Sequence, residues 1–185
     1  VGTSGSYVDD LIQEGSCGFK KETVRLTKGK FDVKDPVAPP MTFTGMRIGT
    51  NEDGVSTISQ VEYISRLTQL PSSASWVQYR SMRAKLAWVT NSRPEICSAI
   101  SICTQVAEQT FSHQCVNEVN KIIRYLKKTQ DVQLRYPALN SGSLRLLIYA
   151  DASFNNREGN RSQLGYLFIA RRCDGKFFCH CRQVI

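Results

Sequence analysis

The chain has 185 residues, of which 41% are hydrophobic, a fraction that is enough for a packed core in one domain or two small ones. Its net charge of +8 is uneven, because residues 1–60 hold 7 Lys and Arg against 8 Asp and Glu, whereas residues 61–185 hold 17 against 8. No run approaches the roughly 20 apolar residues of a membrane-spanning helix, so we expect no membrane partner.

Both ends of the sequence lie in strand-like segments, and the first residue is Val1 rather than Met. We therefore expect the chain to be a piece of a longer protein. The seven cysteines are an odd and scattered set, which favours a reducing, intracellular setting.

The first predicted element is a hairpin around two adjacent carboxylates, Asp9 and Asp10. Tyr7 and Val8 precede them and an apolar Leu-Ile pair follows. Since side chains alternate along a strand, the two carboxylates can gather only if the chain turns there. Such a turn offers the oxygen ligands that Mg²⁺ prefers and that nucleotide polymerases use. A solvated acidic turn is the alternative, because Asp is a common turn residue.

A short helix and a second hairpin are expected next. The spacing of Phe19 and Leu26 predicts a helix with a Lys-rich opposite face. Prolines between residues 36 and 40 then predict a rigid linker, because proline disfavours helix at the residue before it. Residues 43–48 and 55–59 are predicted to form two strands around an Asn-Glu-Asp-Gly turn.

The apolar pattern then changes to a helical period. Pro71 ends the first of these helices, and Pro94 stands in the first turn of the third. The four predicted helices lie around residues 60–70, 79–89, 94–107 and 119–126.

The last of these helices has four cations on its outer face, Lys121, Arg124, Lys127 and Lys128. They could bind a phosphate backbone, and an acidic tip followed by a basic body suits a metal site beside a nucleic-acid track. A solvated helix surface is the alternative, because the spacing is not diagnostic.

The C-terminal part returns to β-structure. Residues 144–150 are mostly apolar, which indicates a strand covered on both faces, with Asp151 at its end. Two further strands at 163–170 and 176–181 predict an antiparallel meander. The position of Asp151 suits a catalytic carboxylate or, alternatively, a structural turn or cap.

Seven short motifs follow one another along the chain. They are Tyr7-Val8-Asp9-Asp10, Phe43-Thr44-Gly45-Met46-Arg47-Ile48, Ser59-Gln60-Val61-Glu62-Tyr63-Ile64, Tyr79-Arg80-Ser81, Arg93-Pro94-Glu95-Ile96, Arg124-Tyr125-Leu126-Lys127 and Tyr149-Ala150-Asp151-Ala152-Ser153. The first resembles the Tyr-x-Asp-Asp box of reverse transcriptases. The ordered set, over nearly the whole chain, resembles the pol polyprotein of copia-type retrotransposons from the end of the polymerase palm into RNase H.

The resemblance implies roles for individual residues. Asp9 and Asp10 would be palm carboxylates that hold Mg²⁺ for two-metal nucleotidyl transfer, with Asp9 as the expected direct ligand. Tyr7 would support the primer end, and Val8 would line the template–primer groove. Asp151 would be the first metal-binding carboxylate of the RNase H site. The implied partners are an RNA template, a DNA primer, an RNA–DNA hybrid and the rest of the polyprotein.

The resemblance also implies an α+β fold in three parts. Residues 1–70 would end the reverse transcriptase palm, and residues 71–140 would form a helical thumb and connection. Residues 141–185 would be the N-terminal, truncated part of an RNase H-like domain, with its first three antiparallel strands. We further expect the acidic pair to face a cleft walled by the cationic helices.

The family's third palm carboxylate, its fingers and its further RNase H acids have no counterpart in these residues, and Glu95 replaces the family's Asp. We therefore expect residues 1–185 alone neither to extend a primer nor to cut a hybrid. The alternative function is a degenerate or host-recruited retroelement remnant that at most binds nucleic acid through its basic helices.

Overall fold

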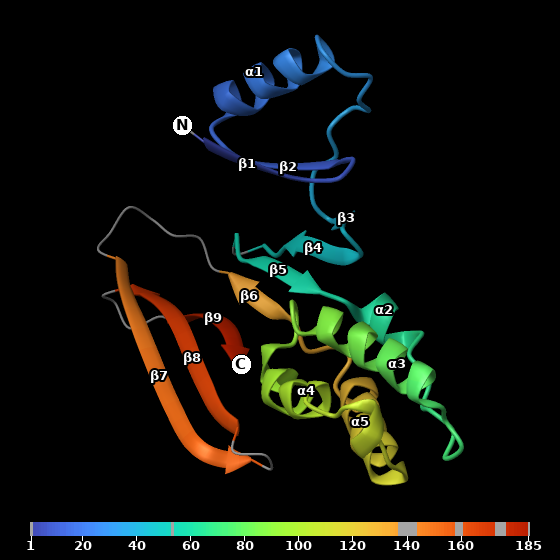
Figure 1. The fold of residues 1–185 in the computed structure, drawn as a ribbon. Coiled ribbons are helices and arrows are strands. Elements are labelled where there is room, and N and C mark those ends of the chain that lie inside the picture. The colour runs from blue at the N-terminus through green and yellow to red at the C-terminus, as the bar shows by residue number, and fades with distance from the viewer. Residues whose placement is uncertain (1, 53, 137–143, 158–160, 173–176, 185) are drawn as a thin grey trace.

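The computed structural model describes residues 2–52, 54–136, 144–157, 161–172 and 177–184. Within these residues the chain forms five α-helices and three antiparallel sheets of two, four and three strands (Figure 1). The expected α+β class is confirmed. No helix in the described ranges is long and apolar enough to cross a membrane.

The N-terminal unit is a hairpin followed by a helix. Strands β1 (Gly2–Tyr7) and β2 (Asp10–Gly15) pair antiparallel, and α1 (Cys17–Lys28) follows directly. The expected hairpin and helix are thus confirmed. The helix begins after Ser16, whose hydroxyl accepts a hydrogen bond from a backbone N–H of the first turn.

Gly2 lets this helix pack closely on the hairpin. A Cβ atom at Gly2 would lie 2.3 Å from a ring carbon of Phe19, which is closer than side chains can approach. No residue of this N-terminal unit is buried.

The second sheet has the strand order β3 (Met41–Phe43), β4 (Met46–Thr50), β5 (Ser56–Ser59) and β6 (Leu134–Tyr136). The prediction of one strand over residues 43–48 is wrong, because the chain reverses between β3 and β4. Both turn residues have positive φ, +49° at Thr44 and +77° at Gly45, as a type I′ hairpin turn requires.

Strand β6 was not predicted. Its three residues are too few to show a strand period, and they become a strand by pairing with β5. This pairing returns the chain to the second sheet after the last helix, so the sheet and the helices form one connected body (Figure 1).

Helices α2 (Val61–Ser65), α3 (Trp76–Val89), α4 (Cys97–Thr104) and α5 (His113–Lys128) form the helical unit, and a short 3-10 turn, Pro94–Ile96, precedes α4. Another 3-10 turn spans Glu108–Thr110. A capping box fixes the start of α3, because Ser75 and Gln78 each accept a backbone N–H from the other.

The prediction of one helix over residues 60–70 is wrong, because α2 already ends at Ser65. The buried side chain of Asn120 accepts the N–H of Leu70 and donates to its carbonyl, both at 2.8 Å. These two bonds hold the segment after α2 against α5, so a side chain replaces the backbone partners that a longer helix would provide.

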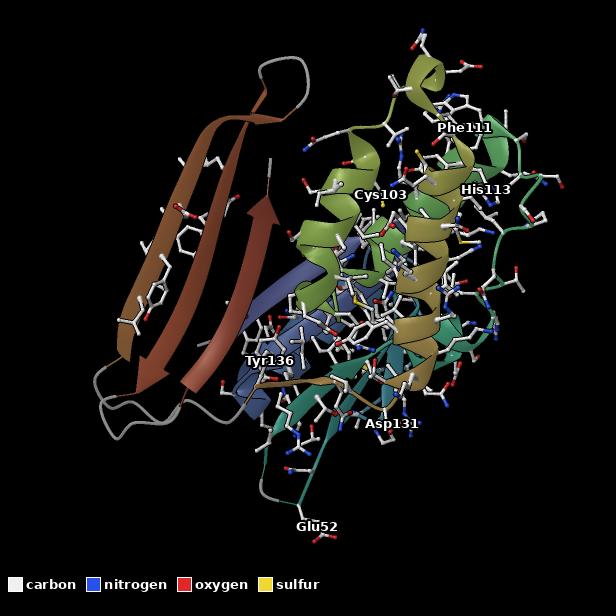
Figure 2. The ribbon with its side chains drawn as sticks, turned by 90° about the horizontal axis from the view of Figure 1, so that it is seen from below. Glu52, Cys103, Phe111, His113, Asp131 and Tyr136 are labelled. Carbon is white, nitrogen blue, oxygen red and sulfur yellow. The ribbon has the colours of Figure 1, made fainter. Side chains whose placement is uncertain are left out.

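The core lies among the four helices of this unit. Helices α3 and α5 each bury an apolar stripe at helical spacing, and Cys103 of α4 joins them (Figure 2). Leu67, which follows α2, packs into the same core as the residues of α3, α4 and α5.

The third sheet is the predicted antiparallel meander, with β7 (Leu144–Arg157), β8 (Arg161–Arg172) and β9 (Phe177–Val184) in that order. Residues 173–176, between the last two strands, lie outside the described residues. The expectation that β7 is covered on both faces is wrong, because Leu146 and Ile148 are 61% and 59% exposed. The reason is that α4 packs near β9, at the opposite edge of the sheet from β7.

Candidate nucleic-acid and metal-binding residues

The acidic pair lies at the apex of the first hairpin. Tyr7 and Asp10 are directly opposed across the strands, and Val8 with Asp9 forms the two-residue turn between them. Val8 is 86% exposed and has a φ of +51°. This conformation is unusual for a β-branched residue and costs about 1–2 kcal/mol. Both carboxylates are exposed to solvent.

One face of the hairpin remains uncovered by α1. Directly opposed residues project to the same face of a two-stranded sheet, so Tyr7 and Asp10 share a face, and Gly2 lies on the other. Because α1 packs through Phe19 on the Gly2 face, Tyr7 and Asp10 stay accessible.

The carboxylate oxygens of Asp9 and Asp10 are of the right chemical type to bind Mg²⁺, but two carboxylates are few for a metal site. Carboxylate oxygens are the ligands that Mg²⁺ accepts. In the described part of the chain, no three His, Cys, Asp or Glu side chains gather closely enough to hold a metal ion. Asp9 and Asp10 thus provide two carboxylates on an exposed turn, and weak binding follows because affinity grows with the number of charged ligands.

Asp151 lies inside a strand and not at its end, which corrects the prediction. Backbone pairing continues past it, with Asp151 opposite Gly165 and Ser153 opposite Gln163. The apolar run that predicted the strand stops at residue 150, but pairing with β8 carries the polar residues beyond it. Asp151 is exposed.

The four predicted cations lie on the exposed side of α5, as expected from their spacing. Lys121 forms an ion pair of 2.6 Å with Glu118, and Arg124 donates a hydrogen bond of 2.9 Å to the side-chain oxygen of Gln69. Lys127 and Lys128 extend the same surface to the end of the helix. Their charge also compensates the negative end of the helix dipole.

The structure does not bring these groups together. Figure 1 shows the β1–β2 hairpin at one end of the molecule and α5 at the other, with the β3–β6 sheet between them. Elements separated in one view are at least that far apart in space. The expectation that the acidic pair faces a cleft walled by cationic helices is therefore wrong. The physical reason is the proline-containing segment 31–40, which contains no helix or strand and carries the chain away from the hairpin.

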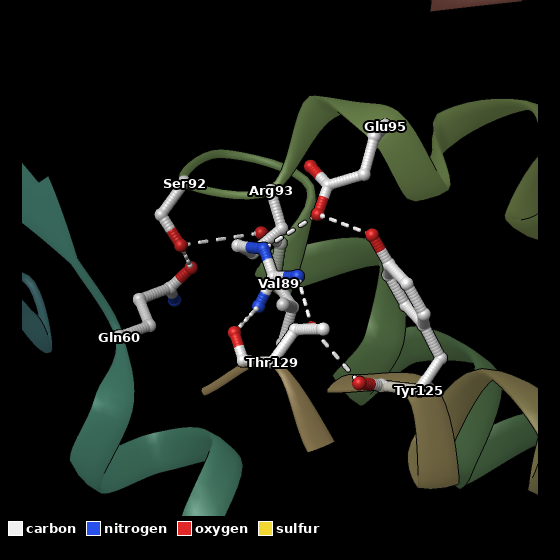
Figure 3. Close-up of polar contacts among 7 residues, drawn as sticks. All are labelled: Gln60, Val89, Ser92, Arg93, Glu95, Tyr125 and Thr129. Atoms are coloured by element: carbon white, nitrogen blue, oxygen red, sulfur yellow. Dashed lines mark hydrogen bonds and ion pairs between the residues drawn. The ribbon is translucent and has the colours of Figure 1, made fainter. Parts of the chain in front are cut away.

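A buried polar cluster around Arg93 was missed by sequence reasoning (Figure 3). The Arg93 side chain is 1% exposed and its Nε donates to Glu95 Oε1 at 2.6 Å. Its Nη1 donates to the backbone carbonyl of Thr129 at 2.9 Å, and its Nη2 donates to the hydroxyl of that residue at 2.6 Å. Arg93 therefore ties the turn before α4 to the residue that ends α5.

Three of the seven motifs meet at this cluster. The guanidinium of Arg93 lies 5.6 Å from the ring centroid of Tyr125, and the neighbouring Ser92 is hydrogen-bonded to Gln60 at 2.7 Å. The motifs that begin at residues 59, 93 and 124 therefore share a structural role. A signal was present in the sequence, because an Arg-Pro-Glu run directly before an apolar helix places a charge where burial is expected.

A second polar contact caps α4 from inside the core. The hydroxyl of Tyr79 donates to the carbonyl of Cys103 at 3.0 Å, and Arg83 donates to the carbonyl of Val106 at 3.0 Å. Burial raises the pKa of Tyr79 well above its usual value of 10.0, since the ionised phenolate would be desolvated. Burial likewise raises the pKa of the Cys103 thiol. Both groups are thus held neutral as parts of the core.

No protein-family model, curated protein or solved structure matches this chain.

Proposed function

We propose that the chain is part of the RNA-directed DNA polymerase and RNase H of a copia-type retrotransposon. In this proposal residues 1–70 end the polymerase palm, the helices form thumb and connection elements, and β7–β9 begin the RNase H-like domain. The observation that carries the proposal is the Tyr7–Asp10 motif at the apex of a two-residue hairpin, with both carboxylates exposed. The six other motifs in collinear order support it.

In the complete enzyme, the four motif residues at the tip of the hairpin would each have a role. Asp9 and Asp10 would hold Mg²⁺, which when bound activates the primer 3′ hydroxyl and neutralises the leaving pyrophosphate. Tyr7, on the same face as Asp10, would support the primer end, while the exposed Val8 would line the template–primer groove. Asp151 would contribute one carboxylate to hydrolysis of the RNA strand of a hybrid.

The decisive experiment uses the longer reading frame that contains these residues. We expect it to extend a DNA primer on an RNA template in the presence of Mg²⁺, and Asp9→Asn to reduce extension at least about a hundredfold, because two-metal catalysis depends on its carboxylate ligands. Glu52→Gln is the matched control, since Glu52 is an exposed acid next to another hairpin turn. Full extension by the Asp9→Asn variant would contradict the proposal.

Residues 1–185 alone are expected to be inactive in the same assay, because two exposed carboxylates bind Mg²⁺ weakly. Measurable Mg²⁺-dependent primer extension by this chain would overturn that expectation.

Binding can be measured separately from catalysis. We expect the chain to bind an RNA–DNA hybrid with an affinity that falls as salt rises, because phosphate contacts release counterions. Replacing Lys127 or Lys128 by Gln should each lower the slope of log K against log salt by about one. Binding without salt dependence, or no binding, would remove the nucleic-acid interface from the proposal.

The second candidate is a degenerate or host-recruited remnant that only binds nucleic acid. The wide separation of the acidic hairpin from α5 favours this candidate, because a binding helix does not need the carboxylates (Figure 1). It predicts salt-dependent binding by residues 1–185 together with no extension by the longer protein.

A further inference from the structure

An exposed aromatic ring lies within the basic surface of α5. Tyr125 is 46% exposed and is spaced four residues after Lys121 and three before Lys128. Residues at these spacings are neighbours on one side of an α-helix. The outer surface of the last two turns therefore presents cations on both sides of one aromatic ring.

The ring is held in place from beneath. The guanidinium of Arg93 lies 5.6 Å from its centroid, and its hydroxyl donates to Glu95 Oε1 at 3.5 Å. Arg93 is itself buried and bonded to Thr129, so the support is fixed. An exposed ring with a fixed rotamer loses little conformational entropy when a ligand stacks on it.

We infer that Tyr125 stacks on an unpaired base of a single-stranded nucleic acid bound along α5. This inference rests on the proposed function and names the kind of nucleic acid that the helix takes. Lys121 and Lys128 would contact the phosphates on either side, and they are about 10 Å apart along the helix axis. Aromatic side chains next to cations bind single strands in this way, whereas the bases of a duplex are already stacked on one another.

Charge and chemistry both point to this ligand. Residues 121–128 of α5 include four cations and no acidic residue, and Glu118, one turn before Lys121, pairs with it. Glu95 is occupied by Arg93 and by the Tyr125 hydroxyl, so its charge is already compensated at this surface. A single-stranded nucleic acid complements both the cations of α5, through its phosphates, and the Tyr125 ring, through its unpaired bases.

The test compares two probes bound to residues 1–185 by fluorescence anisotropy, a labelled single-stranded RNA and a blunt RNA–DNA hybrid. Tyr125→Leu should weaken binding of the single strand about tenfold, within the range of base–aromatic stacking, and leave binding of the hybrid within about twofold. Its salt slope should not change, because no phosphate contact is lost. Lys128→Gln should instead weaken both probes and lower the slope by about one.

Matched variants separate stacking from a structural role. Tyr125→Phe and Tyr125→Trp keep an aromatic ring and should bind the single strand like the natural protein, even if the leucine variant is less stable. Tyr149→Leu removes an exposed tyrosine from β7 and should not affect binding.

Three outcomes would overturn the inference alone. These are unchanged single-strand binding in Tyr125→Leu, an equal loss on both probes, or a loss in Tyr125→Trp as large as in the leucine variant. Failure of the proposed interface would look different, because the natural protein would then bind neither probe with salt dependence.

Discussion

The helical unit and the N-terminal hairpin unit both contain motifs that resemble those of copia-type pol polyproteins. The two units differ in how deeply these motif residues are buried. Around the helices the motif residues Gln60 and Arg93 are buried. Gln60 is hydrogen-bonded to Ser92, the neighbour of Arg93, and Arg93 donates to Thr129. In the hairpin unit no residue is buried, and Tyr7, Asp9 and Asp10 face solvent. Motifs of one resemblance therefore lie both in a buried scaffold and on an exposed turn.

The largest expected effect tests this difference directly. Leu86→Ala removes a fully buried side chain from α3 and should lower the free energy of unfolding by about 3–4 kcal/mol, from lost burial and the cavity left behind. Leu26→Ala on the exposed side of α1 should cost less than about 1 kcal/mol. Urea unfolding followed by circular dichroism measures both, and equal losses would show that the two units are equally packed.

Arg93→Met should give the next largest loss, about 3 kcal/mol, because Thr129 loses two hydrogen-bond donors and Glu95 loses its ion-pair partner. Arg80→Met is the control, since Arg80 is exposed on α3. The same urea titration applies, and a neutral Arg93→Met variant would contradict a structural role for the cluster.

The core should also respond to alkaline pH. The folded pKa of Tyr79 is raised by burial, so this group stabilises the fold fully below its usual value of 10.0, and the stabilisation is lost as pH rises above that value. The reason is that the unfolded chain releases a proton which the folded chain retains. Tyr79→Phe should lower the free energy of unfolding by about 1 kcal/mol at neutral pH. Above pH 10 its free energy of unfolding should fall less with rising pH than that of the natural protein.

Unfolding midpoints measured across alkaline pH test this expectation, with Tyr7→Phe in the hairpin as the control. An unchanged pH dependence in Tyr79→Phe would argue against burial as the cause of the raised pKa.

The smallest effect concerns the hairpin turn. Val8→Gly should stabilise the hairpin by up to about 1 kcal/mol, because glycine adopts a positive φ without the steric cost that valine carries, minus its own entropic cost. Gly5→Ala is the control, since a Cβ there would meet Ile12 at an ordinary 3.6 Å. Slower amide exchange in β1 and β2 would confirm the strain, and faster exchange would contradict it.

Elements with strong local signals were predicted correctly from sequence. The turn at Asp9, helices α1, α3 and α5, and the C-terminal meander each follow from a pattern within a few residues. The four cations of α5 were also correctly predicted to lie on the outer face of their helix, because the apolar residues between them define its buried side. The Thr44–Gly45 turn had such a signal as well, but an apparent strand period obscured it.

Other features depend on partners that are distant in sequence. The segment after α2 is held by Asn120, 50 residues beyond Leu70, and β6 is a strand only because β5 pairs with it. The position of Asp151 within β7 depends on its pairing with Gly165. Local patterns contain no information about such contacts, so these errors share one physical cause.

The sequence by itself determined which segments can bury an apolar face and that the cations of α5 stay in water. Only the tertiary structure decided that Arg93 is buried, that Tyr125 is fixed above it, and that the acidic hairpin and α5 lie at opposite ends of the molecule. The reason is that hydrophobic period and turn chemistry act over a few residues, whereas the burial of a charge and the distance between two sites depend on how the elements pack.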